Sequence, residues 1–388
     1  MEDLQMNGAV KSLLALLETL KQEPYELSLF LSSHAGELTA MIPSHVTLLQ
    51  EDPSYAVMRL SVREGIRYAL RNGRIDLVIA RMFVGLSRAR KWAFPCWFML
   101  PEIRGKWDVV IAYADGFIGQ VVTKKIPCGK KILWIHTDYR KYKMSQKTFK
   151  AFSIADGAVT VSHDSGEAFK QCFAGAYLKP LLLIHNVIDP IEVLKKAIEA
   201  VQIPIQHSAF RLVSVGRITL TKGFDLIPTI AKCLQSNNLD FEWFIVGGGN
   251  DWERTRWEQA VVNNGVQQRV KFIGSVLNPM PWVTSADIIV QPSRFEGWGM
   301  TVSEALILKK PIVVTDLAVF HEQIKDSENG LFASLDAEDF ARKILLLAKS
   351  PELRMKMACY RENYPFLPAN VRREFSEMLM SVGVLGGN

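Results

Sequence analysis

The chain of 388 residues is longer than one hydrophobic core usually serves, so its length predicts two domains. Its 48% hydrophobic and 22% charged residues are typical of a globular protein and exclude a disordered chain. The net charge of +6 suits a phosphate-bearing ligand or an anionic membrane surface. No zinc-finger or RNP signature accompanies this charge, so nucleic acid is not an expected partner.

The cysteines and the N-terminal residues bear on the compartment. The five cysteines are odd in number and far apart, which predicts neither a disulfide framework nor a cysteine zinc site. Acidic residues precede the first apolar stretch, unlike a signal peptide, and no run approaches the roughly 18 apolar residues of a spanning helix. These features favour a cytoplasmic protein, with peripheral attachment to the inner face of a membrane left open.

In the first half of the chain, short apolar runs alternate with longer amphipathic stretches, the pattern of a parallel sheet covered by helices. A helix is predicted over residues 10–20. Only Gly8 and the short, polar stretch 1–6 precede it, so the first strand expected of such a sheet is missing from this sequence. Three explanations are open: a misassigned start, a truncated gene, or a first domain that has lost its central strand. Strands are predicted at residues 25–31, 76–80, 108–112, 131–136, 158–162 and 182–186.

Residues 81–107 combine basic and aromatic side chains. Basic residues attract anionic lipid, and Trp and Phe enter the headgroup boundary, so this cluster predicts docking on a membrane surface. An alternative is that the aromatic residues pack in the interior and the cations form a solvated helix face, because Pro95 and Pro101 interrupt a long amphipathic helix. The cluster comprises Arg81, Phe83, Arg88, Arg90, Lys91, Trp92, Phe94, Trp97, Phe98, Arg104, Lys106 and Trp107.

The second half repeats the pattern after a linker at residues 189–208. Pro365 and Pro368 are expected to break the final helical region. We predict an N-terminal domain over residues 1–190, a nucleotide-sugar-binding domain over 205–350 and a helical tail, 351–388, that returns to the first domain. The predicted fold class is α/β, with two Rossmann-like doubly wound domains facing a central cleft. Strands are predicted at residues 211–215, 242–246, 270–273, 287–290, 311–315 and 330–333.

The segment 292–306, PSRFEGWGMTVSEAL, carries the most informative pattern. A strand leads into a turn containing Gly297 and Gly299, and a helix begins directly after it, so backbone N–H groups and a helix N-terminus would face an anion. Glu296 lies before the glycines and Glu304 lies inside the helix; carboxylates accept hydrogen bonds from sugar hydroxyls. An alternative is that Glu304 only solvates the helix and the glycines only form a turn.

A second pattern, GRITLTKG, follows the strand at 211–215. Arg217 offers a planar fork and Lys222 a compact charge, and both suit the phosphates of a departing nucleoside diphosphate. The alternative is two solvated surface cations. The sequence contains no Asp-x-Asp triplet, no Walker A loop, no G-x-G-x-x-G and no G-x-S-x-G. A diphosphate would therefore be held by side-chain cations and backbone N–H groups, without a metal or a P-loop.

From Val213 to about Ser350 the chain resembles the C-terminal domain of glycosyltransferase family four. The motifs that carry the resemblance are, in order, VSVGRITLTKGFDLI, FIVGGG, VKFIGSV, ADIIVQPSRFEGWGMTVSEAL, KKPIVVTD and NGLFA. Glu296 and Glu304 match the family's E-x7-E element. The earlier stretch DVVIAYADGFIGQVV…KKILWIHTDY looks like bacterial enzymes that build surface polysaccharides.

The resemblance implies a GT-B fold, a nucleotide-diphosphate sugar as co-substrate, net retention, and neither a metal nor another cofactor. It implies hexosyl transfer to a saccharide or lipid-linked acceptor in surface polysaccharide or glycoconjugate synthesis. The alternatives are a non-catalytic sugar-nucleotide-binding subunit, which the missing first strand favours, and a GT-B epimerase, which predicts no E-x7-E element. The implied catalytic residues are His136, Glu296, Arg217 and Lys222; the donor-binding residues are Gly8, Arg217, Lys222, Gly297, Gly299, Met300, Thr301 and Glu304; Asp138 lies on the acceptor side.

Overall fold

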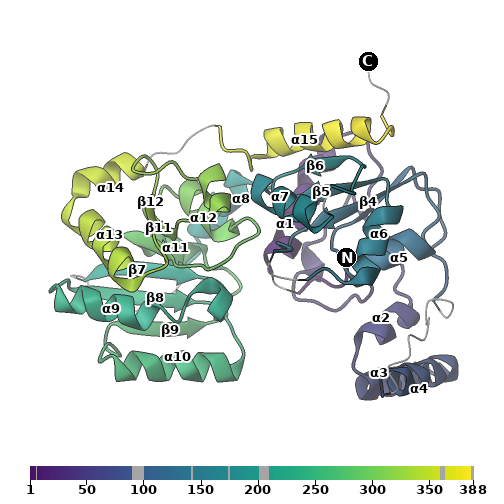
Figure 1. The fold of residues 1–388 in the computed structure, drawn as a ribbon, viewed down its shortest axis with the longest axis horizontal. Helices are drawn as coiled ribbons and strands as arrows, with labels where there is room; N and C mark the ends of the chain where they lie inside the picture. The colour runs from purple at the N-terminus through teal and green to yellow at the C-terminus, as the bar shows by residue number, and fades with distance from the viewer. Residues whose placement is uncertain are drawn as a thin grey trace. The chain divides into compact units, whose positions relative to one another are not determined.

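The computed structural model divides into two compact units, each with parallel strands and helices (Figure 1). Unit 1 holds residues 1–161, 165–184 and 372–388, and unit 2 holds 162–164 and 185–371. The boundary expected near residue 190 therefore lies at 184–185, and only the end of the helical tail belongs to unit 1. The structure describes residues 1–5, 7–89, 100–140, 143–173, 175–200, 209–358 and 363–385.

Unit 2 contains a six-stranded parallel sheet with the strand order β12-β11-β10-β7-β8-β9. From β7 the chain moves outward through β8 and β9, then crosses back to β10 on the other side of β7. The switch point of this doubly wound sheet lies between β7 and β10, at whose carboxyl ends ligands bind in such folds. The strands are β7 (Phe210–Val215), β8 (Phe241–Val246), β9 (Val270–Gly274), β10 (Ile288–Gln291), β11 (Ile312–Thr315) and β12 (Leu331–Ala333).

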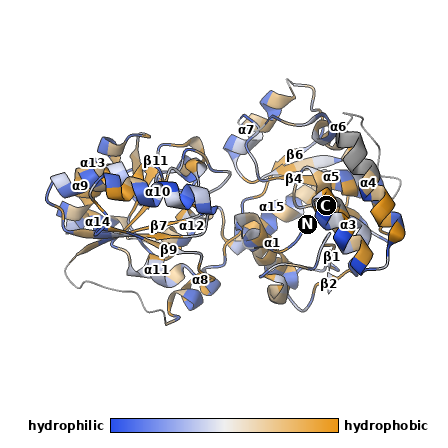
Figure 2. Ribbon diagram, turned by 90° about the horizontal axis from the view of Figure 1, so that it is seen from below, coloured by the Kyte–Doolittle hydropathy of each residue, from blue (hydrophilic) through white to orange (hydrophobic). Residues whose placement is uncertain are grey.

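Helices cover both faces of this sheet, and Figure 2 shows α9, α10 and α13 on one side and α8 and α11 on the other. Leu212, Trp243 and Ile344 belong to the core under the first group, and none is exposed. The sheet is thus buried on both faces, which explains why its strands are continuous apolar runs. The helices of this part are α8 (Pro190–Ala197), α9 (Ile227–Ser236), α10 (Asp251–Asn263), α11 (Met280–Ser285), α12 (Met300–Ile307), α13 (Ala337–Lys349) and α14 (Pro351–Met357), with 3-10 turns η4 (Leu220–Lys222) and η5 (Ala318–Glu322).

Unit 1 contains a four-stranded parallel sheet, in the order β3-β4-β5-β6, and a separate parallel pair, β1-β2. Leu133, Phe152 and Phe169 join β4, α6 and α7 in one buried core. Among the described residues, no strand precedes α1; residues 1–5 run beside 32–38, with Ser32 N donating to Met1 O at 3.2 Å. The strands are β1 (Ser28–Leu29), β2 (Thr47–Leu48), β3 (Val109–Ala112), β4 (Lys130–Ile135), β5 (Gly157–Thr160) and β6 (Leu181–Leu183).

The helices of the N-terminal part begin with α1, which Asn7 caps by accepting a hydrogen bond from Val10 N at 3.0 Å. The final helix, α15, packs in unit 1, where the rings of Tyr25 and Phe375 lie 6.1 Å apart. The helices are α1 (Gly8–Thr19), α2 (Pro53–Arg59), α3 (Val62–Arg71), α4 (Ile75–Ala89), α5 (Phe117–Lys125), α6 (Gln146–Ile154), α7 (His163–Cys172) and α15 (Pro368–Ser381), with 3-10 turns η1 (Leu20–Gln22) and η2 (Thr39–Met41).

Most predicted strands overlap the observed ones, but the strand predicted at 76–80 is wrong. These residues lie in α4, where Leu77, Ala80 and Arg81 are buried and Ile79 is exposed. Buried positions at i, i+3 and i+4 are the period of a helix, which the short apolar run concealed. The pair β1-β2 contains one strand, β2, that the sequence did not predict.

Arg81 is fully buried and donates a hydrogen bond to the carbonyl of Leu60, so it is not a surface cation of the basic and aromatic cluster. Arg104 and Lys106 are exposed. The cluster's central residues, 90–99, lie outside the described residues, as do the side chains of 83–89. Within the described ranges, no helix combines the length and the apolar character that crossing a bilayer requires.

Candidate functional site

In unit 2, the loops that follow β7 and β10 are locked together at the switch point. Their strands are neighbours in parallel register, with Leu212 opposite Ile288. Gly223 has a φ of +71°, and a Cβ at this position would lie 1.7 Å from the carbonyl oxygen of Pro292. Only glycine permits this approach. The backbone of the two loops also joins directly, because Arg294 N donates to Thr221 O at 2.9 Å.

The side chain of Arg294 reinforces this junction. Its guanidinium donates to both carboxylate oxygens of Asp225, one of them at 2.7 Å, and to the carbonyl of Leu220 at 3.1 Å. Bidentate pairs of this kind fix orientation as well as supplying energy. Arg294 was not predicted from the sequence, although it stands inside the most informative motif. Its observed contacts hold the Lys222 loop against the Glu296 loop.

Lys222 and Glu296, predicted from separate motifs, form one ion pair. Lys222 Nζ lies 2.6 Å from Glu296 Oε1, with side-chain exposures of 24% and 7% respectively. Ser293 Oγ donates to the same oxygen at 2.8 Å. Lys222 is therefore not a solvated surface cation, and the carboxylate of Glu296 is oriented before any ligand is present.

Arg217 differs from Lys222. It is exposed, and its side chain has no partner among the residues that the structure describes. Its position directly after β7 and Gly216 places it at the same sheet edge as Lys222. The five N–H donors of the guanidinium are thus available to an anion, while the alternative of a solvated cation stays open for this residue.

The glycine turn before α12 is also shaped by close contacts. Gly299 has a φ of +89°, and a Cβ there would lie 2.5 Å from Phe320 Cε1. No side chain caps α12, and the N–H groups of Met300 and Thr301 have no described acceptor. Thr301 Oγ1 donates to Val215 O at 3.3 Å and fastens the helix to the end of β7. The arrangement leaves backbone donors at a helix N-terminus, which suits a phosphate.

A buried network supports this turn from below. Trp298, 2% exposed, donates through Nε1 to Ser303 Oγ at 3.0 Å, and Ser303 Oγ donates to Gln323 Oε1 at 2.6 Å. Gln323 Nε2 returns to the carbonyl of Trp298 at 2.6 Å. These residues were not predicted as contributors. Because the cycle joins the turn to the segment after η5, it restricts the path of Gly297–Gly299.

Glu304 lies on α12 and is 8% exposed. A carboxylate that only solvated the helix surface would be largely exposed, so the burial of Glu304 disfavours that alternative.

The predicted residues Gly8, His136 and Asp138 belong to unit 1. The ring of His136 lies 4.8 Å from that of Tyr113, and its Nε2 is buried with no partner among the described residues. Burial lowers the pKa of His136 to about 4, against a smaller raising effect of a hydrogen bond to the backbone of Tyr113. The imidazole is therefore neutral near pH 7. Gly8 is the first residue of α1.

Asp138 is 3% exposed and is occupied by Arg140. The carboxylate accepts hydrogen bonds from the backbone N of Arg140 at 2.7 Å and from its Nε at 2.9 and 3.0 Å. Asp115, which was not predicted, follows β3 and accepts a hydrogen bond from the hydroxyl of Tyr139. Burial raises the pKa of Asp115. Unit 1 thus carries a partly buried carboxylate, Asp115, in addition to the predicted and buried Asp138.

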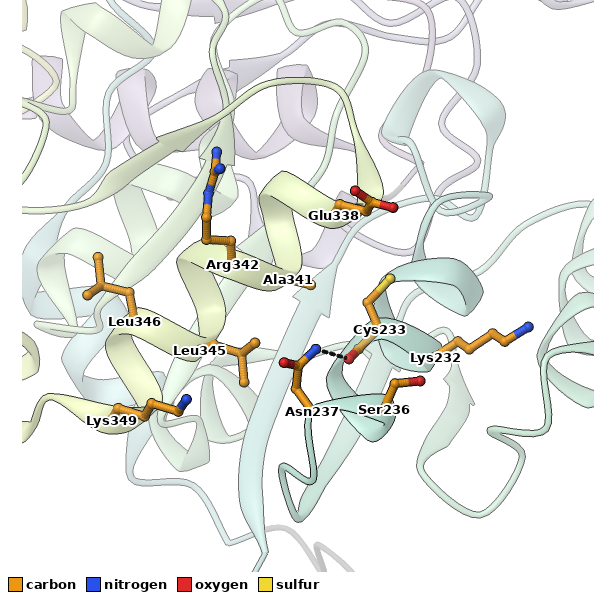
Figure 3. Close-up of a pocket in the computed structure, with 10 residues that line it drawn as sticks. All are labelled: Lys232, Cys233, Ser236, Asn237, Glu338, Ala341, Arg342, Leu345, Leu346 and Lys349. Carbon is orange, nitrogen blue, oxygen red and sulfur yellow. Dashed lines mark hydrogen bonds between the residues drawn. The ribbon is translucent and has the colours of Figure 1, made fainter.

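A groove of about 640 Å³ lies in unit 2 between α9 and α13 (Figure 3). Its polar lining includes Lys232, Arg342, Lys349 and Glu338. None of the residues predicted to bind a donor lines this groove. No group of three or more His, Cys, Asp or Glu among the described residues is placed to hold a metal ion.

Comparison with known proteins gives one family and many similar folds. The model of the family "Glycosyl transferases group 1" matches residues 195–363. The lipopolysaccharide core biosynthesis mannosyltransferase LpsB of Rhizobium meliloti is 29% identical over 126 residues, 31% of this chain and 36% of that protein. Alpha-D-kanosaminyltransferase of Streptomyces kanamyceticus is 28% identical over 158 residues, 40% of each protein. The matches thus span well under half the length of these relatives.

Solved structures extend the likeness to the whole chain. Anabaena HepE, solved in complex with UDP, superposes with a TM-score of 0.66 at 16% identity, covering 98% of this chain and 100% of that one. WaaG, a glycosyltransferase involved in lipopolysaccharide biosynthesis, has a TM-score of 0.59 at 16% identity and covers 100% of this chain and 99% of that one. These similarities confirm the fold class predicted from the sequence, the GT-B fold.

Proposed function

We propose that the whole chain is a glycosyltransferase, because residues 195–363 match the model of the family "Glycosyl transferases group 1". It moves a hexose from a nucleotide-diphosphate sugar to a saccharide or lipid-linked acceptor, in the synthesis of a surface polysaccharide or glycoconjugate. The observation that carries this proposal is the junction of Lys222, Glu296 and the uncapped α12 at the switch point of the unit 2 sheet. The similarity to LpsB, a lipopolysaccharide core biosynthesis mannosyltransferase, supports the proposed pathway.

In this proposal the diphosphate is held by Arg217, Lys222 and the N–H groups of Met300 and Thr301. Negative charge grows on the diphosphate as the bond to the sugar breaks, and oriented donors stabilise that charge most in a partly desolvated site. Lys222 is 24% exposed and reaches the phosphate from its ion pair with Glu296. Since these cations and N–H groups carry the charge, the reaction needs no metal ion.

The two glutamates take the hydroxyl groups of the donor. Oε1 of Glu296 is engaged by Lys222 and Ser293, whereas Oε2 has no described partner and accepts from the transferred sugar. Glu304, buried on α12, takes the ribose hydroxyls. For unit 1, the proposal is that His136 acts as a neutral imidazole and binds a hydroxyl group of a substrate through Nε2, which has no described partner.

The proposed chemistry is a front-face displacement with retention. The bond between the anomeric carbon and the phosphate oxygen breaks while the acceptor oxygen bonds to the same face of that carbon. The acceptor proton passes to the leaving phosphate oxygen, so the products are the glycosylated acceptor and a nucleoside diphosphate. In double displacement, the alternative mechanism, Glu296 would act as the nucleophile instead of accepting a hydrogen bond from a hydroxyl of the sugar.

Binding and turnover can be tested in sequence. A ligand that binds only the folded state at 100 times its Kd stabilises that state by about 2.7 kcal/mol, so thermal unfolding with UDP, GDP, ADP and dTDP identifies the nucleotide. Release of that nucleotide from its sugar derivatives is then measured with and without a lipid extract as acceptor. Acceptor-dependent release is expected. Binding of no nucleotide would refute the proposal, and binding without acceptor-dependent release would support a non-catalytic sugar-nucleotide-binding subunit instead.

A further inference from the structure

Strand β10 ends in a buried amide. Residues 288–290 are apolar, yet the next residue, Gln291, is a glutamine and is only 1% exposed. Burying an amide costs free energy unless hydrogen bonds replace those made with water. Gln291 Nε2 donates to Ser293 Oγ at 3.0 Å, but Oε1 has no partner among the described residues. An apolar side chain would fill this buried position without burying an amide. The hydrogen bond to Ser293 is the interaction that glutamine makes here and an apolar residue could not.

That bond directs the hydroxyl of Ser293. A serine hydroxyl has one hydrogen to donate and two lone pairs to accept. Since Gln291 occupies a lone pair, the hydrogen of Ser293 Oγ is free for Glu296 Oε1, 2.8 Å away. Lys222 Nζ is the second donor to this oxygen, at 2.6 Å. The carboxylate is thus fixed through Oε1, and Oε2 is left without a described partner.

The amide lies within the site. A Cβ built on Gly216, at the start of the Arg217 loop, would lie 3.9 Å both from Gln291 Nε2 and from Lys222 Cδ. The amide of Gln291 and the stem of Lys222, the lysine that pairs with Glu296, therefore both lie close to Gly216 at the start of this loop.

We propose that Gln291 and Ser293 are positioning residues that orient Glu296 Oε2 toward the hydroxyls of the donor sugar. The inference rests on the proposed function and adds two residues to that site. Ser293 contacts the carboxylate of Glu296 and Gln291 contacts Ser293, so neither is proposed to contact the ligand. Their effect is therefore confined to the sugar part of the donor, while the diphosphate keeps Arg217, Lys222 and the start of α12.

The test compares a nucleoside diphosphate with its sugar derivative, using the pair that binds wild type most tightly among UDP with UDP-glucose, GDP with GDP-mannose, ADP with ADP-glucose and dTDP with dTDP-glucose. In Ser293→Ala, Glu296 loses a donor, so affinity for the sugar nucleotide and turnover should fall about tenfold, the effect of one hydrogen bond to a charged group. Affinity for the diphosphate should change less than about twofold. Ser293→Thr keeps a hydroxyl and should restore both sugar-dependent values to within about threefold of wild type.

The order of the two residues gives a second readout. Gln291→Leu should lower sugar-nucleotide affinity about three- to tenfold, and adding it to Ser293→Ala should cause no further loss, because the two act in series. Ser214→Ala is the matched control. Ser214 is another fully buried serine of unit 2, hydrogen-bonded to Val290 O at 2.5 Å, and its loss should leave the ratio of the two affinities unchanged.

Four results would overturn the relay: wild-type behaviour of Ser293→Ala, equal losses for diphosphate and sugar nucleotide in that variant, no rescue by Ser293→Thr, or additive losses in the double variant. If wild type binds none of UDP, GDP, ADP and dTDP and none of their sugar derivatives, the proposed function fails and the relay fails with it. If wild type binds and Ser293→Ala behaves as wild type, only the relay is refuted.

Discussion

Replacing Lys222 by methionine keeps the side-chain stem and removes the charge that pairs with Glu296. The carboxylate, with 7% of its side chain exposed, then keeps only the hydrogen bond from Ser293. Removing one partner of a fully buried pair costs about 3–5 kcal/mol. Because Lys222 is 24% exposed, water reaches the vacated position, and we expect a loss nearer about 2 kcal/mol, typical of a hydrogen bond to a charged group.

The loss should appear as a lower melting temperature of unit 2. For a unit of this size, about 2 kcal/mol corresponds to about 4–8 °C. Calorimetry of wild type, Lys222→Met, Glu296→Gln and the double variant gives the coupling between the two residues, expected to exceed about 1 kcal/mol. Lys232→Met, an exposed lysine on α9, is the control and should change stability by less than about 0.5 kcal/mol.

Ligand binding separates the two roles of Lys222. The double variant Lys222→Met/Glu296→Gln should regain most of the stability, because no unpaired carboxylate remains, but its affinity for a nucleoside diphosphate should stay about 10- to 100-fold below wild type. If Lys222→Met has the melting temperature of wild type, the ion pair does not contribute to the stability of the protein in solution. If it binds the diphosphate with wild-type affinity, Lys222 is not part of the phosphate site.

Four further outcomes are expected. Arg217→Ala should weaken diphosphate binding by about 1.5–3 kcal/mol in calorimetry with no change in melting temperature, since its side chain has no described partner; unchanged affinity would place the phosphate elsewhere. Glu304→Ala and Glu296→Ala should each lower turnover at least about a hundredfold with folding intact, and near-wild-type rates in both would remove the E-x7-E argument. Transfer should persist in excess EDTA, whereas inhibition reversed by Mn²⁺ or Mg²⁺ would show that a metal carries the diphosphate. The pKa of His136 in the folded protein, about 4, lies below its ordinary value of 6.5, so between these pH values protonation favours the unfolded state. The free energy of unfolding should therefore fall as the pH falls from 6.5 to 4, and it should fall less in His136→Gln.

The sheet of unit 2 could be predicted because its strands are continuous apolar runs separated by turn residues. A strand buried on both faces leaves such a run, as in β8, where all residues are buried and Glu242 alone is not apolar. The same signal failed at 76–80, where a run of similar length belongs to α4. Short apolar runs do not by themselves distinguish a strand from a buried helix face. The helical period appears only in a longer segment, in which Ile75, Ile79 and Met82 are exposed.

The members of the candidate site could be predicted singly, but not their pairing. Lys222 and Glu296 are 74 residues apart, and they meet because β7 and β10 are neighbours across a crossover. Arg294 and Asp225 meet for the same reason. A sequence pattern predicts that each residue follows a strand; it does not predict which strands are adjacent. By contrast, the pairing of Asp138 with Arg140 spans two residues, and the run DYR carried that signal.

The polar groups predicted to bind substrate differ in whether they already have a hydrogen-bond or ion-pair partner. Lys222 and Asp138 are engaged in ion pairs before any ligand arrives, so a ligand reaches them only by sharing or displacing a partner. Arg217, Nε2 of His136 and Oε2 of Glu296 have no described partner, and the last two are on buried or nearly buried groups. Unsatisfied polar atoms in such places raise the free energy of the empty protein, and a ligand that supplies their hydrogen bonds recovers it. Within unit 2, the specificity for the sugar should therefore reside at Glu296, whose nearly buried carboxylate has one oxygen without a described partner. Affinity for the diphosphate should depend mainly on Arg217. Its exposed charge is hydrated in the empty protein, so leaving it unpaired until the ligand binds costs little free energy.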